Sequence, residues 1–325
     1  MNCKENVIRA VGMKRPDSLP FLYINKDKCD SDAIIIDVEK HFIDDRVKRS
    51  EWGFEWKKID ETMGQPRGTV IKTWEDLNRF TAPDPNDLSR FSSAIEDMQK
   101  YPGKFYIASL GLSGFTIMTF LRGFSNVLED ILLEDAKIGR LADIVFGFEE
   151  EIIKQLKNYG FDAVAFYDDW GTQNNLIISP KLWRSFFKPR YKRQFDLAHR
   201  HGLYTYFHSC GYIYDIIGDL IEIGMDMFNM AQPNVYDIKK LGAEYAGKTC
   251  FVCPISYQTT AISGNMEDIY EEAERLLGSF WDDNGGFIAY IEAYESIGLS
   301  RENYRHCINA FKTLSKTVKR GNKNA

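Results

Sequence analysis

Short apolar segments alternate with longer amphipathic segments along most of this 325-residue chain. Each short segment has the length of a buried strand, and each longer one spaces its apolar residues as in a helix that buries one face. Strands that alternate with helices favour a parallel sheet, and eight such repeats favour a closed (β/α)8 TIM barrel of the α/β class. The expected strands cover residues 20–24, 32–37, 104–110, 162–167, 203–208, 225–229, 249–255 and 286–291.

Start and stop signals mark the boundaries of the expected helices. Ser179 followed by Pro180 is typical of a helix N-cap and first helical position, and Gly202 follows the end of the same segment. Pro189 lies inside this segment, where the missing N–H should kink the helix. The expected helices cover residues 115–133, 137–159, 180–201, 212–223, 235–245, 266–281 and 301–317.

One connection is much longer than the others. Residues 38–103 separate the second and third expected strands and contain three of the six tryptophans. We interpret this segment as an N-terminal insertion that caps one end of the barrel. Because the interior has no low-complexity segment or flexible linker, the sequence predicts one domain over residues 1–318 and a disordered tail over 319–325.

Composition and charge exclude several classes of protein. The net charge of −6 gives no sign of nucleic-acid binding, and the apolar runs are much too short to span a membrane. The N-terminus has no apolar signal core, so we expect a cytoplasmic protein. In that compartment the six cysteines should be free thiols or metal ligands.

Cys250 and Cys253 form a C-x-x-C pattern inside an expected strand. Their side chains should point to opposite faces of the sheet, because side chains alternate along a strand. We therefore expect core packing for this pair, and no shared metal or redox role.

His208 and Cys210 provide the most informative pattern. They end an expected strand, and residues two apart on a strand point the same way. An imidazole and a thiolate on one face can bind one metal ion, and zinc accepts both ligands. Gly211 then permits the chain to turn away. A half-buried histidine beside a packed cysteine is the simpler interpretation, and the pair alone leaves it open.

The third metal ligand should come from another strand end, because the chemistry of such barrels lies where the strands end. Glu292 follows the last expected strand and is our candidate, with Glu295 as a competing carboxylate. Three protein ligands leave a fourth position for substrate or water, as in catalytic zinc sites. We therefore predict zinc bound by His208, Cys210 and Glu292.

Other strand ends also carry polar side chains, partly because strands become polar where they reach solvent. The adjacent Asp168 and Asp169 should point in roughly opposite directions, one into the mouth and one toward a neighbouring loop. A helix-dipole or loop-bonding role explains either acid equally well. Arg122 can meet an anionic substrate or lie at the surface. The catalytic candidates are Asp168 and His208, and the substrate-binding candidates are Arg122, Asp169, Gln173, Gln232 and Ser256.

These segments together resemble the uroporphyrinogen decarboxylase superfamily, and within it the branch of cobalamin-dependent methyltransferases. The resemblance runs from residues 15–20 to residues 302–303, which is nearly the whole chain, and it implies the same barrel. The segments that carry it, in the order of the superfamily, are LRGF at 121–124, DDWGTQ at 168–173, ISPKLW at 178–183, KPRY at 188–191, HSCG at 208–211 and AQP at 231–233.

The chain departs from the superfamily at three places. Uroporphyrinogen decarboxylases carry arginines after the first strand that hold the substrate's carboxylates, whereas residues 23–28 contain none. Decarboxylation of a tetrapyrrole is therefore disfavoured. The methyltransferase branch usually takes a late cysteine as third zinc ligand, but the only late cysteine is Cys307, in an expected helix; either Glu292 replaces it or the metal is absent. Ser256 replaces an aspartate that relatives often carry.

The resemblance implies a zinc-assisted methyltransferase. It would move a methyl group between a corrinoid (cobalamin), held by a partner protein, and a small thiol, methoxy or methylamine substrate, with zinc as Lewis acid. One alternative is a metal-free carboxy-lyase for a smaller substrate, with Asp168 or His208 handling the proton. The other is a barrel that binds a ligand without turnover. The oligomeric state is open, with a homodimer among the options.

Overall fold

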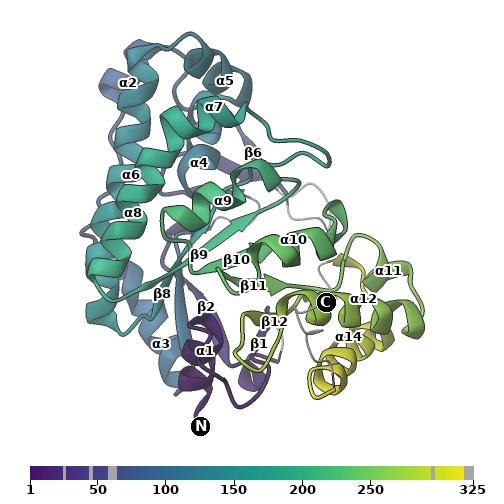
Figure 1. Ribbon diagram of the computed structural model, residues 1–325. Coiled ribbons are helices and arrows are strands. Elements are labelled where there is room, and N and C mark those ends of the chain that lie inside the picture. The colour runs from purple at the N-terminus through teal and green to yellow at the C-terminus, as the bar shows by residue number, and fades with distance from the viewer. Residues whose placement is uncertain (25–26, 44–46, 58–63, 294–296, 318–325) are drawn as a thin grey trace.

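The computed structural model describes residues 1–325 except 25–26, 44–46, 58–63, 294–296 and 318–325 (Figure 1). Eight parallel strands form a nearly closed barrel, and helices lie between them on the outside, as the apolar pattern predicts. The expected tail over 319–325 and the competing carboxylate Glu295 lie outside the described residues. Among the described helices, none has both the length and the apolar character needed to cross a bilayer.

The eight predicted strands are confirmed, and their order around the barrel is β1-β12-β11-β10-β9-β8-β7-β2. At the seam, the backbone N–H of Asp32 donates to the carbonyl of Phe21 at 2.8 Å, and the N–H of Tyr23 donates to the Ser31 hydroxyl at 3.0 Å. These bonds link β1 to the start of β2. The strands are β1 Phe21–Tyr23, β2 Ala33–Asp37, β7 Phe105–Ser109, β8 Ala163–Tyr167, β9 Tyr204–Ser209, β10 Met227–Met230, β11 Cys250–Cys253 and β12 Phe287–Ile291.

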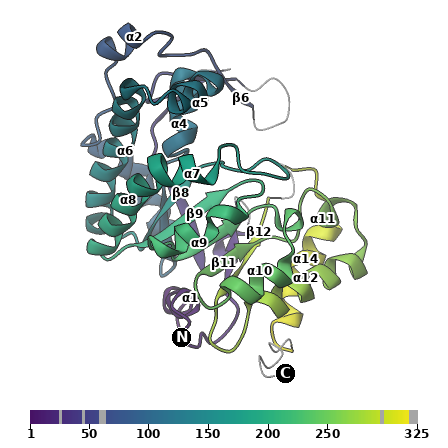
Figure 2. The same ribbon diagram turned by 45° about the horizontal axis from the view of Figure 1, so that its top comes forward.

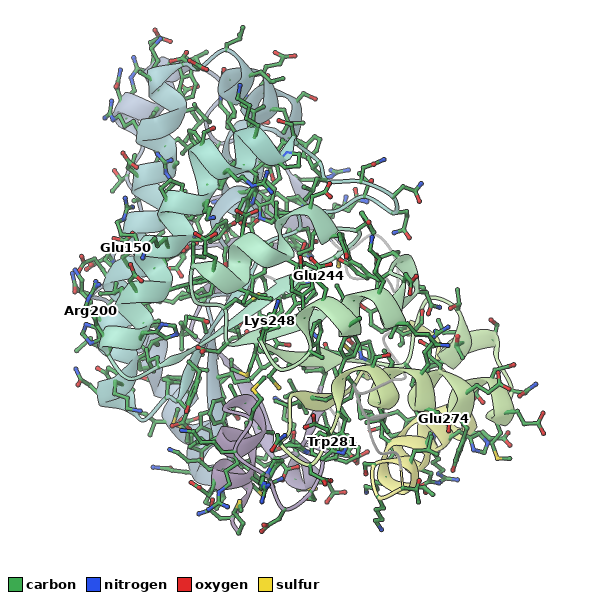
Figure 3. All side chains as sticks on the ribbon, in the orientation of Figure 1. Glu150, Arg200, Glu244, Lys248, Glu274 and Trp281 are labelled. Atoms are coloured by element: carbon green, nitrogen blue, oxygen red, sulfur yellow. The ribbon has the colours of Figure 1, made fainter. Side chains whose placement is uncertain are left out.

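The helices form an outer layer whose outward face is polar. Glu150 and Arg200, on two neighbouring helices, lie at the left edge of Figure 3. The first predicted helix is interrupted by Gly123, whose φ of 93° lies in a region that favours glycine. The longer helices are α3 Ser92–Lys100, α4 Gly114–Arg122, α5 Phe124–Leu132, α6 Ala136–Leu156, α8 Lys188–Arg200, α9 Tyr214–Glu222, α10 Ile238–Tyr245, α12 Met266–Phe280 and α14 Arg301–Leu314.

The helix predicted over residues 180–201 contains a π-helical turn just before Pro189. The segment begins with the short α7 Pro180–Leu182, capped by Ser179, continues as a π-helical turn over Trp183–Phe187, and becomes α8 only afterwards. Proline cannot donate the backbone hydrogen bond of a regular helix, and a π turn is one way to accommodate that loss.

Two apolar cores lie inside and outside the barrel wall. Alternate strand residues fill the lumen, and Val7 and Val11 of α1 Cys3–Val11 pack with them. The other strand residues pack against the outer helices. Cys250 belongs to the lumen cluster and Cys253 to the outer cluster, so the prediction that they face opposite ways is confirmed.

The long connection after β2 forms a second, antiparallel sheet of four short strands. Trp52 packs on Phe148 of α6 with ring centroids 4.8 Å apart, and Phe54 packs on Phe120 of α4 at 5.2 Å. This part of the insertion lies with α4 and α5, at the end of the molecule away from the N-terminus (Figure 2). Its elements are β3 His41–Ile43, β4 Val47–Ser50, β5 Glu55–Lys57, β6 Gln65–Arg67 and α2 Trp74–Arg79.

Candidate metal centre at the barrel mouth

The ends of β8 and β9 bring three metal-binding side chains together. Among the described residues, the ligand atoms of Asp169, His208 and Cys210 all lie within 4.8 Å of one another. His208 is the last residue but one of β9, Cys210 directly follows β9, and Asp169 is the second residue after β8. The predicted His-x-Cys pair therefore shares one direction. Its carboxylate partner is Asp169 from the neighbouring strand end, and Glu292 is not in the group.

The ring of His208 is oriented by an amide on the next strand. Its Nδ1 lies 2.6 Å from Oδ1 of Asn229, and Nδ2 of Asn229 donates to the carbonyl of Val252 at 2.8 Å. Because the amide donates through Nδ2, its Oδ1 must accept from His208, which places a proton on Nδ1. Nε2 then faces the group, 3.6 Å from both Sγ of Cys210 and Oδ1 of Asp169. Such support of a ligating histidine is typical of metal sites.

The electrostatics of the group favour a cation. Burial alone would lower the pKa of His208, but its hydrogen bonds to Asp169 and Cys210 and their charges outweigh burial and raise it well above its ordinary value. For Asp169, burial raises the pKa and the contacts with His208 and the Cys210 amide lower it, with a net lowering. The three side chains thus stabilise positive charge between them.

The two adjacent aspartates have separate roles. Asp168 is fully buried, and it accepts the backbone N–H groups of Phe115 and Thr116, both at 2.8 Å, at the start of α4. It also accepts the hydroxyls of Thr116 and Tyr191. Burial raises the pKa of Asp168 to about 7 in spite of these bonds. Asp168, predicted as a catalytic residue, therefore lies out of reach of solvent and positions Asp169, which faces the mouth and is half exposed.

A second buried acid supports the same helix start. Glu149 of α6 accepts the N–H of Gly114 at 2.8 Å and the amide of Gln194 at 2.5 Å. Burial raises the pKa of Glu149 to about 8, and the nearby charge of Asp168 adds to the shift. The two buried carboxyl groups thus accept the first backbone N–H groups of α4, which have no partner within the helix.

Two glycines permit the loops after β8 and β9 to cross. A Cβ on Gly211 would lie 2.3 Å from the backbone of Gly171, and a Cβ on Gly171 would lie 2.4 Å from the N of Tyr212. Gly211 also has a φ of 73°. The close approach allows the N–H of Gly171 to donate to the carbonyl of Cys210 at 3.2 Å. The crossing joins the segment that carries Asp169 to the segment that carries Cys210.

Three predicted substrate-binding residues contact protein groups. Gln232 accepts the N–H of Gly211 at 3.0 Å and the amide of Gln173 at 3.2 Å, so this pair supports the turn after Cys210. Ser256 is buried; its N–H donates to Glu272 of α12 at 2.9 Å, and its hydroxyl accepts from the hydroxyl of Thr259 at 3.1 Å.

Arg122 lies at the far end of α4 from the metal-binding group, eight residues or roughly 12 Å along the helix. Its Nε donates to Asp130 at 3.0 Å, its Nη1 donates to the carbonyl of Lys72 at 2.6 Å, and its guanidinium lies 4.4 Å above the ring of Trp74. These contacts hold the insertion against the barrel. They leave the side chain of Arg122 largely buried.

The opposite side of the mouth carries Glu292 and tyrosines. The hydroxyl of Tyr290 donates to Glu292 at 2.9 Å, and both side chains are half buried. Tyr257 lines a small hollow together with Tyr290 and Glu292. We name these three residues the tyrosine wall, and Asp169, His208 and Cys210 the ligand wall.

Asn229, Tyr257 and Tyr290 are not among the residues predicted from the sequence. Asn229 and Tyr290 lie at strand positions whose side chains face the lumen, so the alternation along their strands could have identified them. Tyr257 follows Ser256 in a loop, where no periodicity indicates which of two neighbours faces the lumen.

Comparisons with known proteins agree with this architecture. The family model described as uroporphyrinogen decarboxylase (URO-D) matches residues 53–314. A search of curated proteins found no match. A solved methyltransferase from Methanosarcina mazei superposes with a TM-score of 0.75 at 14% sequence identity, covering 97% of this chain and 99% of that chain. A D-psicose 3-epimerase from Clostridium cellulolyticum H10 superposes with a TM-score of 0.48 at 10% sequence identity, covering 90% of this chain and 91% of that chain. At 14% identity, the similarity to the Methanosarcina mazei structure supports the fold alone.

Proposed function

Because the chain belongs to the uroporphyrinogen decarboxylase family, we propose that it is a metal-assisted methyltransferase built on that family's barrel. It would move a methyl group between a corrinoid, carried by a partner protein, and a small substrate. The observation that carries this proposal is the convergence of Asp169, His208 and Cys210 at the mouth. The name of the Methanosarcina mazei neighbour is consistent with it as an analogy of fold.

The donor set fits zinc. A thiolate, an imidazole nitrogen and a carboxylate oxygen are all zinc ligands, and Asn229 already fixes the tautomer that leaves Nε2 of His208 free to bind. We propose Asp169 as the third ligand, in the role that the sequence analysis gave to Glu292. A zinc ion bound there would supply Lewis acidity at an open fourth position.

The rest of the lumen argues against a tetrapyrrole substrate. Asp37, Asp169 and Glu292 face the mouth, and the described strand residues that face the lumen include no arginine or lysine. A substrate with many carboxylates needs several fixed cations. Arg122 cannot supply one, because it is held by Asp130 and Trp74.

Zinc content and methyl transfer should be measured on the same preparations, purified without a histidine tag. We expect one zinc per chain in the wild type and none in Cys210→Ser, with Cys307→Ser as the matched control at a buried cysteine outside the group. Asn229→Ala should weaken zinc binding by about 10- to 100-fold, because it removes the support of the ligating ring.

Methyl transfer is assayed with free methylcobalamin and with reduced cobalamin, over a panel of thiols, methoxy compounds and methylamines. Transfer that disappears in Cys210→Ser and persists in Cys307→Ser supports the proposal. A zinc-free wild type, or transfer that survives in Cys210→Ser, contradicts it.

A further inference from the structure

The tyrosine wall faces the ligand wall across the mouth. The strand order places β12, which ends beside Glu292, across the barrel from β8, which precedes Asp169. Tyr290 packs with the lumen cluster, and His208 has the same strand phase as Tyr204 and Tyr206 in that cluster. Tyr167 lies between the walls, with its ring centroid 4.9 Å from that of His208. Tyr206 lies deeper in the lumen, two residues before His208 on β9, and its ring centroid is 6.1 Å from that of Tyr167. Aromatic rings therefore surround the space beside the ligand wall.

The charges around these rings are negative. Glu292 accepts the hydroxyl of Tyr290 at 2.9 Å, and Asp37 ends β2 with the strand phase of the lumen-facing Ala33 and Ile35. Burial raises the pKa of the Tyr257 and Tyr290 hydroxyls above its ordinary value. These phenols therefore stay protonated, and the negative charge rests on carboxylates at the rim.

The excess of negative charge persists when a metal is bound. A divalent ion held by the Asp169 carboxylate, the Cys210 thiolate and a neutral His208 leaves the ligand wall with no net charge. Glu292 and Asp37 would still carry two negative charges over the lumen, and no described strand residue facing the lumen offsets them. Carboxylates beside aromatic faces are the surroundings in which proteins bind organic cations.

We propose that the substrate of this site carries an organic ammonium group, which binds against Tyr257, Tyr290 and Glu292 while its reacting end points to the ligand wall. This assignment rests on the proposed methyltransferase function and selects one substrate class within it. Rings and carboxylates attract a positive nitrogen over the mouth, whereas the carboxylates of Glu292 and Asp37 would repel an anionic substrate.

Two kinds of substrate share this chemistry. One is a methylated ammonium donor: its C–N bond breaks, the electron pair stays on nitrogen to give a neutral amine, and a reduced corrinoid supplies the electron pair of the new bond to the methyl carbon. An uncharged amine would have to leave as an amide anion, so a site that keeps the nitrogen charged favours this transfer. The other is an amino thiol acceptor whose sulfur meets the metal and whose ammonium meets the tyrosine wall.

The test compares choline with 3,3-dimethylbutan-1-ol, which has the same shape and no charge. Isothermal titration of the zinc-free protein should show at least about tenfold tighter binding of choline, as expected for a cation among aromatic rings and a carboxylate. Glu292→Gln should reduce this preference about fivefold or more, and Tyr257→Leu should reduce it further than Tyr257→Phe. Glu274→Gln, on the outer face of α12, is the control and should leave it unchanged (Figure 3).

Cysteamine and 2-mercaptoethanol, titrated against zinc-loaded protein, separate the two kinds of substrate. If zinc loading tightens the binding of cysteamine, the substrate is an amino thiol. If zinc loading leaves both cysteamine and choline binding unchanged, the substrate is a methylated ammonium compound. Equal binding of choline and its neutral analogue, or no binding of either, overturns the proposal even if methyl transfer to other substrates is observed. A choline preference without zinc or methyl transfer would instead contradict the proposed function and leave the ammonium site standing.

Discussion

The two walls of the barrel mouth are built to different degrees of rigidity. The ligand wall rests on a fully buried Asp168 that caps α4, on the crossing of Gly171 and Gly211, and on the Asn229 amide behind His208. The tyrosine wall shows one direct bond among its side chains, from Tyr290 to Glu292, and its members are half buried.

This difference assigns different tasks to the two walls. Metal ligands must keep fixed distances, so supporting bonds and close backbone contacts favour the ligand wall. Recognition of a soft organic cation depends on ring faces and net charge, and it tolerates small movements. We therefore expect substitutions behind the ligand wall to cost stability and metal together, and substitutions in the tyrosine wall to change substrate preference with little loss of stability.

Gly211→Ala should have the largest effect. A left-handed φ costs a residue with a Cβ roughly 1–2 kcal/mol, and the contact with the Gly171 backbone adds a clash that the crossing cannot relieve. We expect a loss of about 3 kcal/mol or more in urea unfolding, together with loss of zinc.

Gly247→Ala is the matched control for this substitution. Its φ of 81° is similar, but no atom lies within 4 Å of the added Cβ. About 1–2 kcal/mol should be lost there, with zinc retained. Equal losses at both positions would show that the loop crossing contributes nothing.

Glu149→Gln should change how stability depends on pH. Its pKa is about 8 in the folded protein and returns toward 4.5 when the chain unfolds. Between these values the folded protein holds a proton that the unfolded chain releases, so wild-type stability falls as the pH rises and levels off above about 8. The variant should match the wild type near pH 5 and exceed it above pH 8 by on the order of 2 kcal/mol.

Chemical unfolding at several pH values measures this difference. Glu151→Gln, at an exposed position of the same helix, is the control and should follow the wild type at every pH. A Glu149→Gln variant whose stability parallels the wild type throughout would mean that Glu149 is ionised in the folded protein.

Arg122→Lys should have the smallest effect and separates support from substrate binding. Lysine cannot reproduce the planar contact with Trp74 and the two hydrogen bonds, so we expect a loss of about 1–2 kcal/mol in urea unfolding. Zinc content and the choline preference should stay at wild-type values. If Arg122→Lys instead leaves the stability unchanged and weakens the binding of choline, Arg122 binds substrate, as the sequence suggested.

The fold was predictable from the sequence because strand and helix periods are local properties. All eight strands and the opposite faces of Cys250 and Cys253 follow from the alternation of side chains along a strand. The pairing of His208 with Cys210 follows from the same alternation.

The third member of the metal-binding group was not predictable in this way. Asp169 reaches it because Asp168 is drawn to the start of α4, a contact between loops that no local pattern encodes. Glu292 ends its strand just as suitably, and only the spatial arrangement assigns it to the tyrosine wall. Arg122 likewise has a surface or ligand role by sequence, and the partners that hold it come from the insertion and the following helix.

The most direct test of the account is X-ray absorption at the zinc K edge of the loaded protein. We predict a shell with one sulfur near ~2.3 Å and nitrogen or oxygen neighbours near ~2.0–2.1 Å, from Cys210, His208, Asp169 and an exchangeable fourth ligand. The sulfur should vanish in Cys210→Ser. A shell without sulfur, or with two or more sulfurs, would contradict the assignment of the metal to Asp169, His208 and Cys210.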